Sequence, residues 1–306
     1  MRTNLGLVCS LEERPVGRDL GRVIAGLRHS RELSHNIRHK GHVRELPSRA
    51  TAQQILDDLC TVLFPSHFSR IVPGEHDIDT VVAGKLDWAL TLLSEQLRLG
   101  LQFDEAEAGG DRAVRAEEIA VAFAEQLPPI RNLIVSDLHA ALRGDPAATS
   151  IAEVLLCYRG TVATIYHRIA HAIYTLGGRF LARLFADIAH ARTGIDIHPA
   201  AQIGEGFFID HGTGVVIGET AIVGNLVRLY QAVTLGAKNF PADEAGNLVK
   251  GQARHPIIED NVVIYSGATI LGRITVGRDS VIGGSVWLTR SVPPGSVIAQ
   301  ANLRGA

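Results

Sequence analysis

Apolar residues recur at helical spacing from about residue 17 to residue 192. They return at every third or fourth position, which places them on one side of a helix. Thr51, followed three positions later by Gln54, is typical of a helix start, and Pro65 predicts where that helix ends. The clearest apolar stripes are Ile55, Leu56, Leu59, Val62 and Leu63, and then Leu86, Leu90, Leu93 and Leu97. The pattern predicts an all-α N-terminal domain over residues 1–192.

Two prolines predict a boundary within this helical region. A helix that begins near Asp111 is expected to end at Pro128 and Pro129, because proline lacks the N–H that a helix interior needs. The next helix is then expected over residues 130–143.

Capping residues predict the remaining helices. Ser150 and Glu153 form a capping-box pattern ahead of one long helical stretch. Gly177 and Gly178 interrupt that stretch before a last helix, which is expected to end near residue 192.

After Gly194 the apolar period changes to six residues. Thirteen successive hexad positions carry an aliphatic residue, although only 46% of the chain is hydrophobic, so chance is a poor explanation. Such hexads are typical of a parallel β-helix, in which each coil has three short strands and every sixth side chain points to the axis. The sequence therefore predicts an α+β chain whose residues 193–306 form a β-helix. The hexad residues are Ile197, Ile203, Ile209, Ile217, Val223, Leu229, Leu235, Ile258, Ile264, Ile270, Val276, Ile282 and Leu288.

The six-residue register breaks twice, and histidine lies at both breaks. The first break adds two residues just after Asp210 and His211. The second adds about seventeen residues, which predicts a protruding loop at about 236–257 that ends in Arg254 and His255. A repeat that otherwise accepts no insertion is thus interrupted where it carries candidate chemistry.

Asp196 and His211 are candidates for a general base with its orienting carboxylate. Asp196 lies three hexads before the Asp210–His211 pair and is expected on the same face, one coil below, at a spacing of about 4.8 Å. A carboxylate that binds one imidazole nitrogen leaves the other nitrogen free to accept a proton. Both residues could instead satisfy turn backbone, but the interrupted register favours chemistry.

Five stretches carry motifs that are more specific than the hexads. They are RGDPAATSIAEVLLCYRGTVATIYHRIAHAIY, GIDIHPAAQIGEGFFIDHGTGVVIGETAIVGN, YQAVTLGA, RHPIIEDNVVIYSGATILG and SVIGGSVWLTRSVPPGS. Over residues 143–304 the chain resembles the serine O-acetyltransferase family of hexapeptide-repeat acyltransferases. The resemblance implies a left-handed β-helix and the transfer of acetyl from acetyl-CoA to the hydroxyl of L-serine. The products would be O-acetyl-L-serine and CoA, in the first committed step of cysteine biosynthesis.

The resemblance also implies roles for the candidate residues. His211 matches the family's base and Asp196 its orienting carboxylate, and a primary alcohol needs such a base to attack a thioester. Arg254 offers a planar fork for the carboxylate of serine. The other implied substrate contacts are Asp145 and Asp210, which would face the ammonium group, and His255.

The acetyl donor is expected in a groove between neighbouring β-helices. Gly236, Ala237, Ser266 and Gly284 match family positions that contact acetyl-CoA, although each could equally be a turn residue of the coil. No metal is implied.

The resemblance implies an assembly of identical chains. A homotrimer with active sites between subunits is expected, alone or as a dimer of trimers, and L-cysteine is a candidate feedback inhibitor. Family members that dock into O-acetylserine sulfhydrylase use a longer tail ending in isoleucine, whereas this chain ends at Ala306. A stable complex by the tail route is therefore not expected.

Composition narrows the cellular setting. Thirty Lys and Arg against 32 Asp and Glu give a formal charge of -2, so no global basic field would attract nucleic acid. No apolar run approaches the length of a membrane span, and the first ten residues are too polar for a signal peptide. The three cysteines form no CxxC pair, which suits reduced thiols in the cytoplasm.

Other functions fit the residues less well. A γ-type carbonic anhydrase would bind zinc through three histidines at closer spacing than His198, His211 and His255. An acyltransferase acting on a sugar or another hydroxylated acceptor would have no use for Arg254 and Asp145. A scaffold would have no reason to interrupt its repeat beside two histidines.

Four histidines near the N-terminus form a separate cluster. They are His29, His35, His39 and His42. His35 and His39 are four residues apart, which would suit a metal on a helix, but a solvated basic helix face is the favoured interpretation.

Overall fold

The computed structural model describes residues 20–34, 38–39, 42–43, 45–69, 77–103, 110–239, 242–244 and 246–300. The chain divides into two compact units, Met1–Glu45 and Leu46–Ala306. The first unit contains α1 (Leu20–Ser34) and an antiparallel pair of strands, β1 (Arg38–His39) and β2 (His42–Val43).

The N-terminal histidine cluster does not form the helix face that the sequence predicts. The helix α1 ends at Ser34, and His39 pairs with His42 across β1 and β2. Strand residues cannot share a helix face with His29, so that interpretation is wrong. His35 lies outside the described residues.

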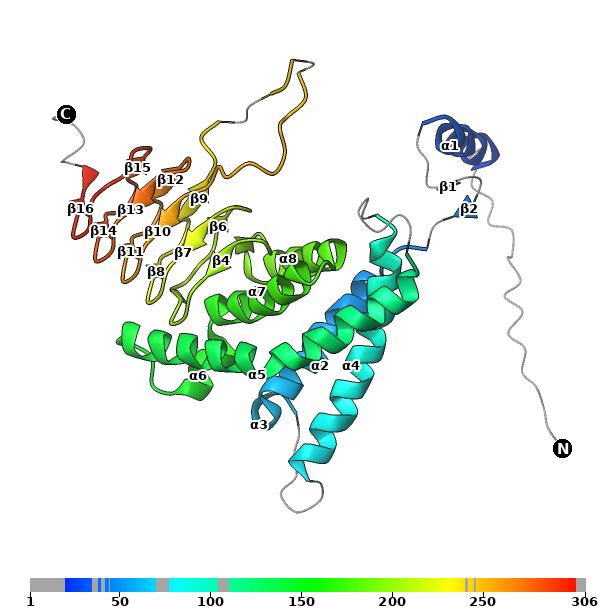
Figure 1. Cartoon of the computed structure of the whole chain (residues 1–306), viewed down its shortest axis with the longest axis horizontal. Helices are drawn as coiled ribbons and strands as arrows, with labels where there is room; N and C mark the ends of the chain where they lie inside the picture. Colours follow the sequence, from blue (N-terminus) through cyan, green and yellow to red (C-terminus); the bar gives the residue numbers. More distant parts are fainter. Residues whose placement is uncertain are drawn as a thin grey trace. The chain divides into compact units, whose positions relative to one another are not determined.

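Seven helices of the second unit are described, and they precede all its strands (Figure 1). They are α2 (Arg49–Leu63), α3 (Pro65–Phe68), α4 (Ile78–Leu101), α5 (Arg112–Gly144), α6 (Ile151–Cys157), α7 (Arg159–Thr175) and α8 (Arg179–Thr193). The sequence-predicted domain boundary after residue 192 lies one residue before the end of α8 and stays a prediction.

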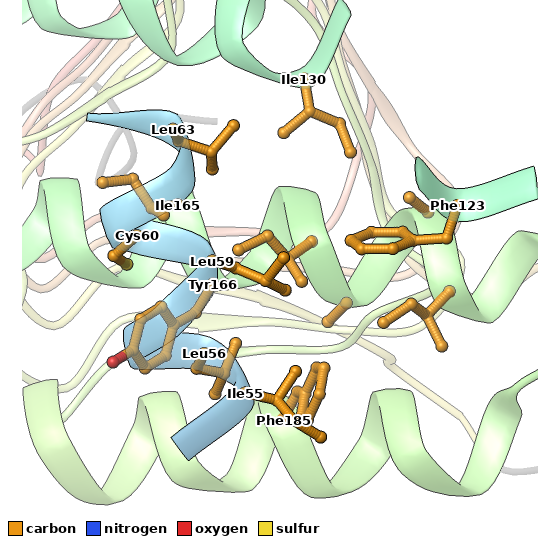
Figure 2. Packing of buried hydrophobic residues seen from close by; sticks show 14 of the residues in the cluster. Ile55, Leu56, Leu59, Cys60, Leu63, Phe123, Ile130, Ile165, Tyr166 and Phe185 are labelled. Atoms are coloured by element: carbon orange, nitrogen blue, oxygen red, sulfur yellow. The ribbon is translucent and has the colours of Figure 1, made fainter. Parts of the chain in front are cut away.

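The helical core is built from the predicted apolar stripes. Figure 2 shows Ile55, Leu56 and Leu59 of α2 pointing toward Phe123 and Phe185, and all five side chains are buried. Their burial removes several hundred square ångströms of apolar surface from water, which is the main stabilising term for such a bundle.

The helix α5 continues without interruption past the two prolines that were expected to end it. Pro128 and Pro129 lie inside the helix, although each lacks the N–H for an intrahelical bond. Phe123, Ile130 and Ile134 on either side are all buried, so one continuous apolar stripe packs into the core. Tertiary packing therefore outweighs the local cost of the prolines.

Two other helix boundaries differ from the sequence prediction. Ser48, not Thr51, is the N-cap of α2, because its hydroxyl accepts the N–H of Thr51 at 3.2 Å. The long helix expected after Ser150 is broken at Tyr158, whose backbone is extended. The Ser150 cap itself is confirmed, since its hydroxyl accepts the N–H of Glu153.

The strands form the coils of a left-handed parallel β-helix, as predicted (Figure 1). In each coil the chain visits three sheets in turn. The first sheet contains β3 (Asp196–Ile197), β6 (Val216–Ile217), β9 (Thr234–Gly236), β12 (Thr269–Leu271) and β15 (Trp287–Leu288). The second contains β4 (Gln202–Ile203), β7 (Ile222–Val223), β10 (Ile257–Ile258) and β13 (Thr275–Val276). The third contains β5 (Phe208–Ile209), β8 (Arg228–Leu229), β11 (Val263–Ile264), β14 (Val281–Ile282) and β16 (Val297–Ile298).

The hexad residues form the axis of this β-helix. Each of the thirteen predicted positions falls within a strand, and all are buried except Ile203, which is half-buried. The residue before each one faces outward, so that Asp196, Val216 and Thr234 form one column on the first sheet.

A buried ion pair joins the helices to the first coil. Arg168 of α7 donates from Nε and Nη2 to the carboxylate of Asp137 on α5, at 2.6 and 2.8 Å. Arg168 also donates to the carbonyl of Gly204, and Asp137 accepts the N–H of Phe207. Both charges are thus satisfied by coil backbone as well as by each other.

None of the helices in the described ranges combines the length and the hydropathy that a membrane span requires.

Candidate active site

The sequence-predicted residues lie at two corners of the β-helix. We call the turns from the third sheet to the first sheet the His211 corner, residues 210–215, 230–233, 265–268 and 283–286. We call the turns from the first sheet to the second sheet the Arg254 corner, residues 198–201, 218–221, 236–239, 242–244, 246–256 and 271–274. The first sheet separates the two corners.

His211 lies on a bulge at its corner. Its backbone is left-handed, with a φ of 57°, and that of Gly212 is left-handed too, with a φ of 90°. The coil register is restored at Gly214, which stacks on Ala232 of the next coil. The two extra residues therefore push the imidazole outward, where its side chain is 73% exposed.

Asp145 lies beside His211. It follows α5 as its C-cap, and its carboxylate accepts the hydroxyl of Tyr158 at 2.5 Å and the N–H of Ala147 at 2.8 Å. The Tyr158 hydrogen bond is the main cause that lowers the pKa of Asp145, and His211 acts in the same direction. Asp145 is a carboxylate at neutral pH, like an ordinary aspartate, and the hydrogen bonds further favour the charged form that binding of an ammonium group requires.

Tyr158 was not among the sequence-predicted site residues. It lies at the break between α6 and α7, where helical periodicity gives no signal. The break lets Gly160 approach β5, and a Cβ on Gly160 would lie 2.1 Å from the carbonyl oxygen of Ile209. Close packing at this glycine fixes the phenol next to the His211 corner.

The expected geometry of Asp196 needs one correction. Because the step after Ile209 is eight residues, strand register places Val216, and not Asp210 or His211, directly above Asp196. The carboxylate that lies nearest to His211 is that of Asp210, with 4.0 Å between Oδ1 and Nε2. The bulge still packs on the chain just before Asp196, since Gly214 donates to the carbonyl of Gly194.

The Arg254 corner contains a tight ion pair. Arg254 Nη2 donates to Glu219 at 2.6 Å, and both side chains are 28% exposed. Burial opposes ionisation of Glu219, but the Arg254 hydrogen bond and charge outweigh it and lower the pKa of this carboxyl. Glu219 follows the hexad residue Ile217 by two positions and gave no sequence signal of its own.

His255 is buried beside Arg254, with 7% of its surface exposed. Its Nδ1 accepts the N–H of Thr220 at 3.1 Å. Its ring packs over Gly218, where a Cβ would lie 2.1 Å from Nε2. Burial, followed by the Arg254 charge, lowers the pKa of His255, so the ring is neutral at pH 7.

His198 is part of the same corner. Its Nδ1 accepts the N–H of Ala200 at 3.0 Å. Burial and then the charge of Arg183 lower its pKa to about 4. Glu219, Arg254 and His255 all act on it electrostatically, which marks one connected group of charges.

The candidate donor-binding residues also divide between the corners. Ser266 and Gly284 lie at the His211 corner, where a Cβ on Gly284 would be 3.2 Å from the carbonyl oxygen of Ser266. Gly236 ends β9, and Ala237 begins the long loop at the Arg254 corner. Within the described ranges, no group of three or more His, Cys, Asp or Glu side chains could hold a metal ion.

Comparisons with known proteins identify a family of acetyltransferases. Residues 255–290 match the family model described as bacterial transferase hexapeptide (six repeats). A plasmid serine acetyltransferase of Synechococcus elongatus is 56% identical over 265 residues, which cover 85% of this chain and 83% of the relative.

Solved structures of similar proteins include ligand complexes. Serine acetyltransferase 1 of Entamoeba histolytica in complex with L-cysteine has a TM-score of 0.71 and 33% identity, covering 82% of this chain and 97% of that chain. Soybean serine acetyltransferase complexed with serine has a TM-score of 0.53 and 31% identity, covering 82% of this chain and 96% of that chain.

Proposed function

Because this chain belongs to the serine acetyltransferase family, we propose that it acetylates L-serine at a site shared between the His211 corner of one chain and the Arg254 corner of the next. The family uses acetyl-CoA as its acetyl donor. The products are O-acetyl-L-serine and CoA, in the biosynthesis of cysteine.

His211 is the proposed general base. As the serine hydroxyl oxygen attacks the thioester carbonyl, His211 takes the hydroxyl proton. The C–S bond then breaks, and the imidazolium returns that proton to the departing CoA thiolate, so that charge and protons balance. The outward position of the imidazole on its bulge supports this role.

Asp196 is the proposed orienting carboxylate for His211. It lies two residues after Gly194, whose carbonyl accepts the N–H of Gly214 in the bulge. Within the described residues, its carboxylate takes part in no side-chain hydrogen bond. The proposal requires the exposed imidazole to rotate, so that one ring nitrogen meets Asp196 and the other faces the substrate.

The remaining site residues divide between the two ends of serine. Asp145 and Asp210 are proposed to bind the ammonium group, and Arg254 and His255 the carboxylate. The hydrogen bond from Tyr158 lowers the pKa of Asp145, and Arg254 presents a planar fork in a partly buried position.

The distance between the two corners of one chain is the main observation that supports a site shared between two chains. The chain crosses the first sheet in the five steps from Thr213 to Gly218, which at about 3.3 Å per step is on the order of 16 Å. Serine is far too short to bridge that span. A cyclic homotrimer, alone or as a dimer of trimers, would bring the His211 corner of one chain to the Arg254 corner of its neighbour.

The donor residues support the same assembly. Ser266 and Gly284 lie at the His211 corner, and Gly236 and Ala237 at the Arg254 corner, so a groove between two chains would be lined by both pairs. We further propose that L-cysteine competes for the serine site, because it differs from serine only by sulfur in place of oxygen.

Acetyl-CoA consumption with L-serine tests the proposed chemistry. The His211→Ala variant is expected to lose at least about 100-fold in turnover and to keep the assembly of the wild type, because loss of a general base commonly costs that much. His190→Ala, on α8, is the matched control. Equal turnover of the wild type and His211→Ala would contradict the assignment of the base.

A further inference from the structure

Thr220 connects the two residues that are proposed to hold the substrate carboxylate. Its hydroxyl oxygen accepts the N–H of Arg254 at 2.9 Å and the N–H of His255 at 3.1 Å. A hydroxyl has two lone pairs and one hydrogen. With both lone pairs engaged, the hydrogen remains to be donated, and Nδ1 of His255 lies 2.9 Å from the oxygen.

The Thr220 backbone points at the same ring nitrogen. Its N–H lies 3.1 Å from Nδ1 of His255, measured between the heavy atoms. An amide N–H can only donate, so Nδ1 must accept, and the single proton of the neutral ring is then on Nε2. In an imidazolium, Nδ1 would also carry a hydrogen, and the two N–H donors would face each other unfavourably. This agrees with the lowered pKa of His255.

Nε2 of His255 is left as a donor without an acceptor. It makes no hydrogen bond to any described residue. Among the described residues, the fully buried side-chain nitrogen and oxygen atoms without a partner are His167 Nδ1 and Gln231 Oε1, and Nε2 of His255 is not one of them. It therefore keeps access to solvent. Gly218 leaves the room that the ring needs.

The base of the long loop is fixed at the same point. Arg273 Nη1 donates to the carbonyl oxygens of Thr220 and His255, at 2.6 and 3.0 Å. The imidazole and its backbone are thus positioned by contacts from the preceding turn, through Thr220, and from the following turn, through Arg273, which limits reorientation of the ring.

We propose that Thr220 is a positioning residue that holds His255 as the neutral Nε2–H tautomer, so that the ring donates a hydrogen bond to the carboxylate of the amino-acid substrate. The proposal rests on the proposed function, in which His255 lines the serine site. It also makes His255 a donor only, which leaves His211 as the base.

Solid-state NMR of full-length protein labelled with ring-¹⁵N histidine tests the tautomer directly. The His255 signals are identified by their absence in His255→Gln. We expect a protonated Nε2 and an unprotonated Nδ1 between pH 6 and pH 8 in the wild type and in Thr220→Ser. In Thr220→Val a second tautomer is expected beside the first, because the hydroxyl is lost and only the backbone N–H of residue 220 still favours an unprotonated Nδ1. A wild-type ring protonated on Nδ1, or an unchanged tautomer in Thr220→Val, would overturn the proposal.

Steady-state kinetics separates this proposal from the proposed function. Thr220→Val is expected to raise the KM for serine about tenfold, the effect of losing one hydrogen bond to a charged group, and Thr220→Ser to restore it. The KM for acetyl-CoA should change little. A serine KM that is unaltered in both His255→Gln and His255→Ala would contradict the substrate contact itself, whatever the tautomer, whereas a raised serine KM with the wrong tautomer contradicts only the role of Thr220.

Discussion

The hydroxyl of Tyr158 donates a 2.5 Å hydrogen bond to the carboxylate of Asp145. The two residues lie thirteen positions apart, at the break between α6 and α7 and at the C-terminus of α5. This bond lowers the pKa of Asp145 below its ordinary value, and the phenol fixes the direction in which the carboxylate faces the His211 corner.

Tyr158→Phe should weaken serine binding more than it slows turnover. Loss of one hydrogen bond of about 1 kcal/mol predicts a serine KM raised about fivefold, with kcat little changed, because Asp145 is proposed to bind the ammonium group and to take no part in proton transfer. Tyr174→Phe is the control, since the Tyr174 hydroxyl has no hydrogen bond within the described chain. A serine KM equal to that of the wild type would refute a role for Tyr158.

Glu219→Gln should raise the serine KM about tenfold. The amide cannot attract the Arg254 guanidinium by charge, so the fork is no longer held where it is proposed to meet the carboxylate of serine. Glu259→Gln is the matched control, because that carboxylate accepts a backbone N–H from Arg278 at the next coil. A serine KM that falls would mean that Glu219 competes with the substrate for Arg254.

Arg168→Met should destabilise the fold by about 3–5 kcal/mol, because it leaves the buried Asp137 carboxylate without its partner. Urea unfolding measures this loss. Arg98→Met, which removes an exposed pair with Glu95, should cost less than about 1 kcal/mol. If Arg168→Met costs no more than Arg98→Met, the ion pair does not stabilise the joint between helices and coils.

Acid should destabilise the protein below pH 6.5, partly through His198. Its folded pKa of about 4 lies below its ordinary value of 6.5, so the unfolded chain binds more protons between these values. The free energy of unfolding therefore falls as the pH drops from 6.5 to 4. His198→Asn keeps an acceptor for the Ala200 N–H and carries no charge, so its urea midpoint should fall less over this range. Parallel pH dependence in the two proteins would exclude His198 as a cause.

The β-helix could be predicted from the sequence because its repeat allows little freedom. A side chain at every sixth position must fit the axis, so Ile217 and Leu235 could be placed in strands without knowledge of the rest. The same strictness made the bulge after Asp210 visible. The separation of the two corners also follows from the register, once Arg254 is placed ahead of a strand of the second sheet.

The remaining features depend on contacts that periodicity cannot show. Helix α5 continues through Pro128 because distant side chains pack along it. Thr220 meets His255 across thirty-five positions, and this contact depends on which coils stack. The direction of a carboxylate such as Asp196 is likewise set by local geometry and not by residue type.

Complementation between two inactive variants tests the shared site most directly. His211→Ala and Arg254→Ala chains, each inactive alone, are co-expressed with different tags, and the mixed assemblies are purified. If each site takes His211 from one chain and Arg254 from its neighbour, every purified mixed trimer has one intact site out of three, so about a third of wild-type activity returns, or about a quarter if the assembly is a dimer of trimers. Activity no higher than that of the two parent variants would contradict a site shared between chains.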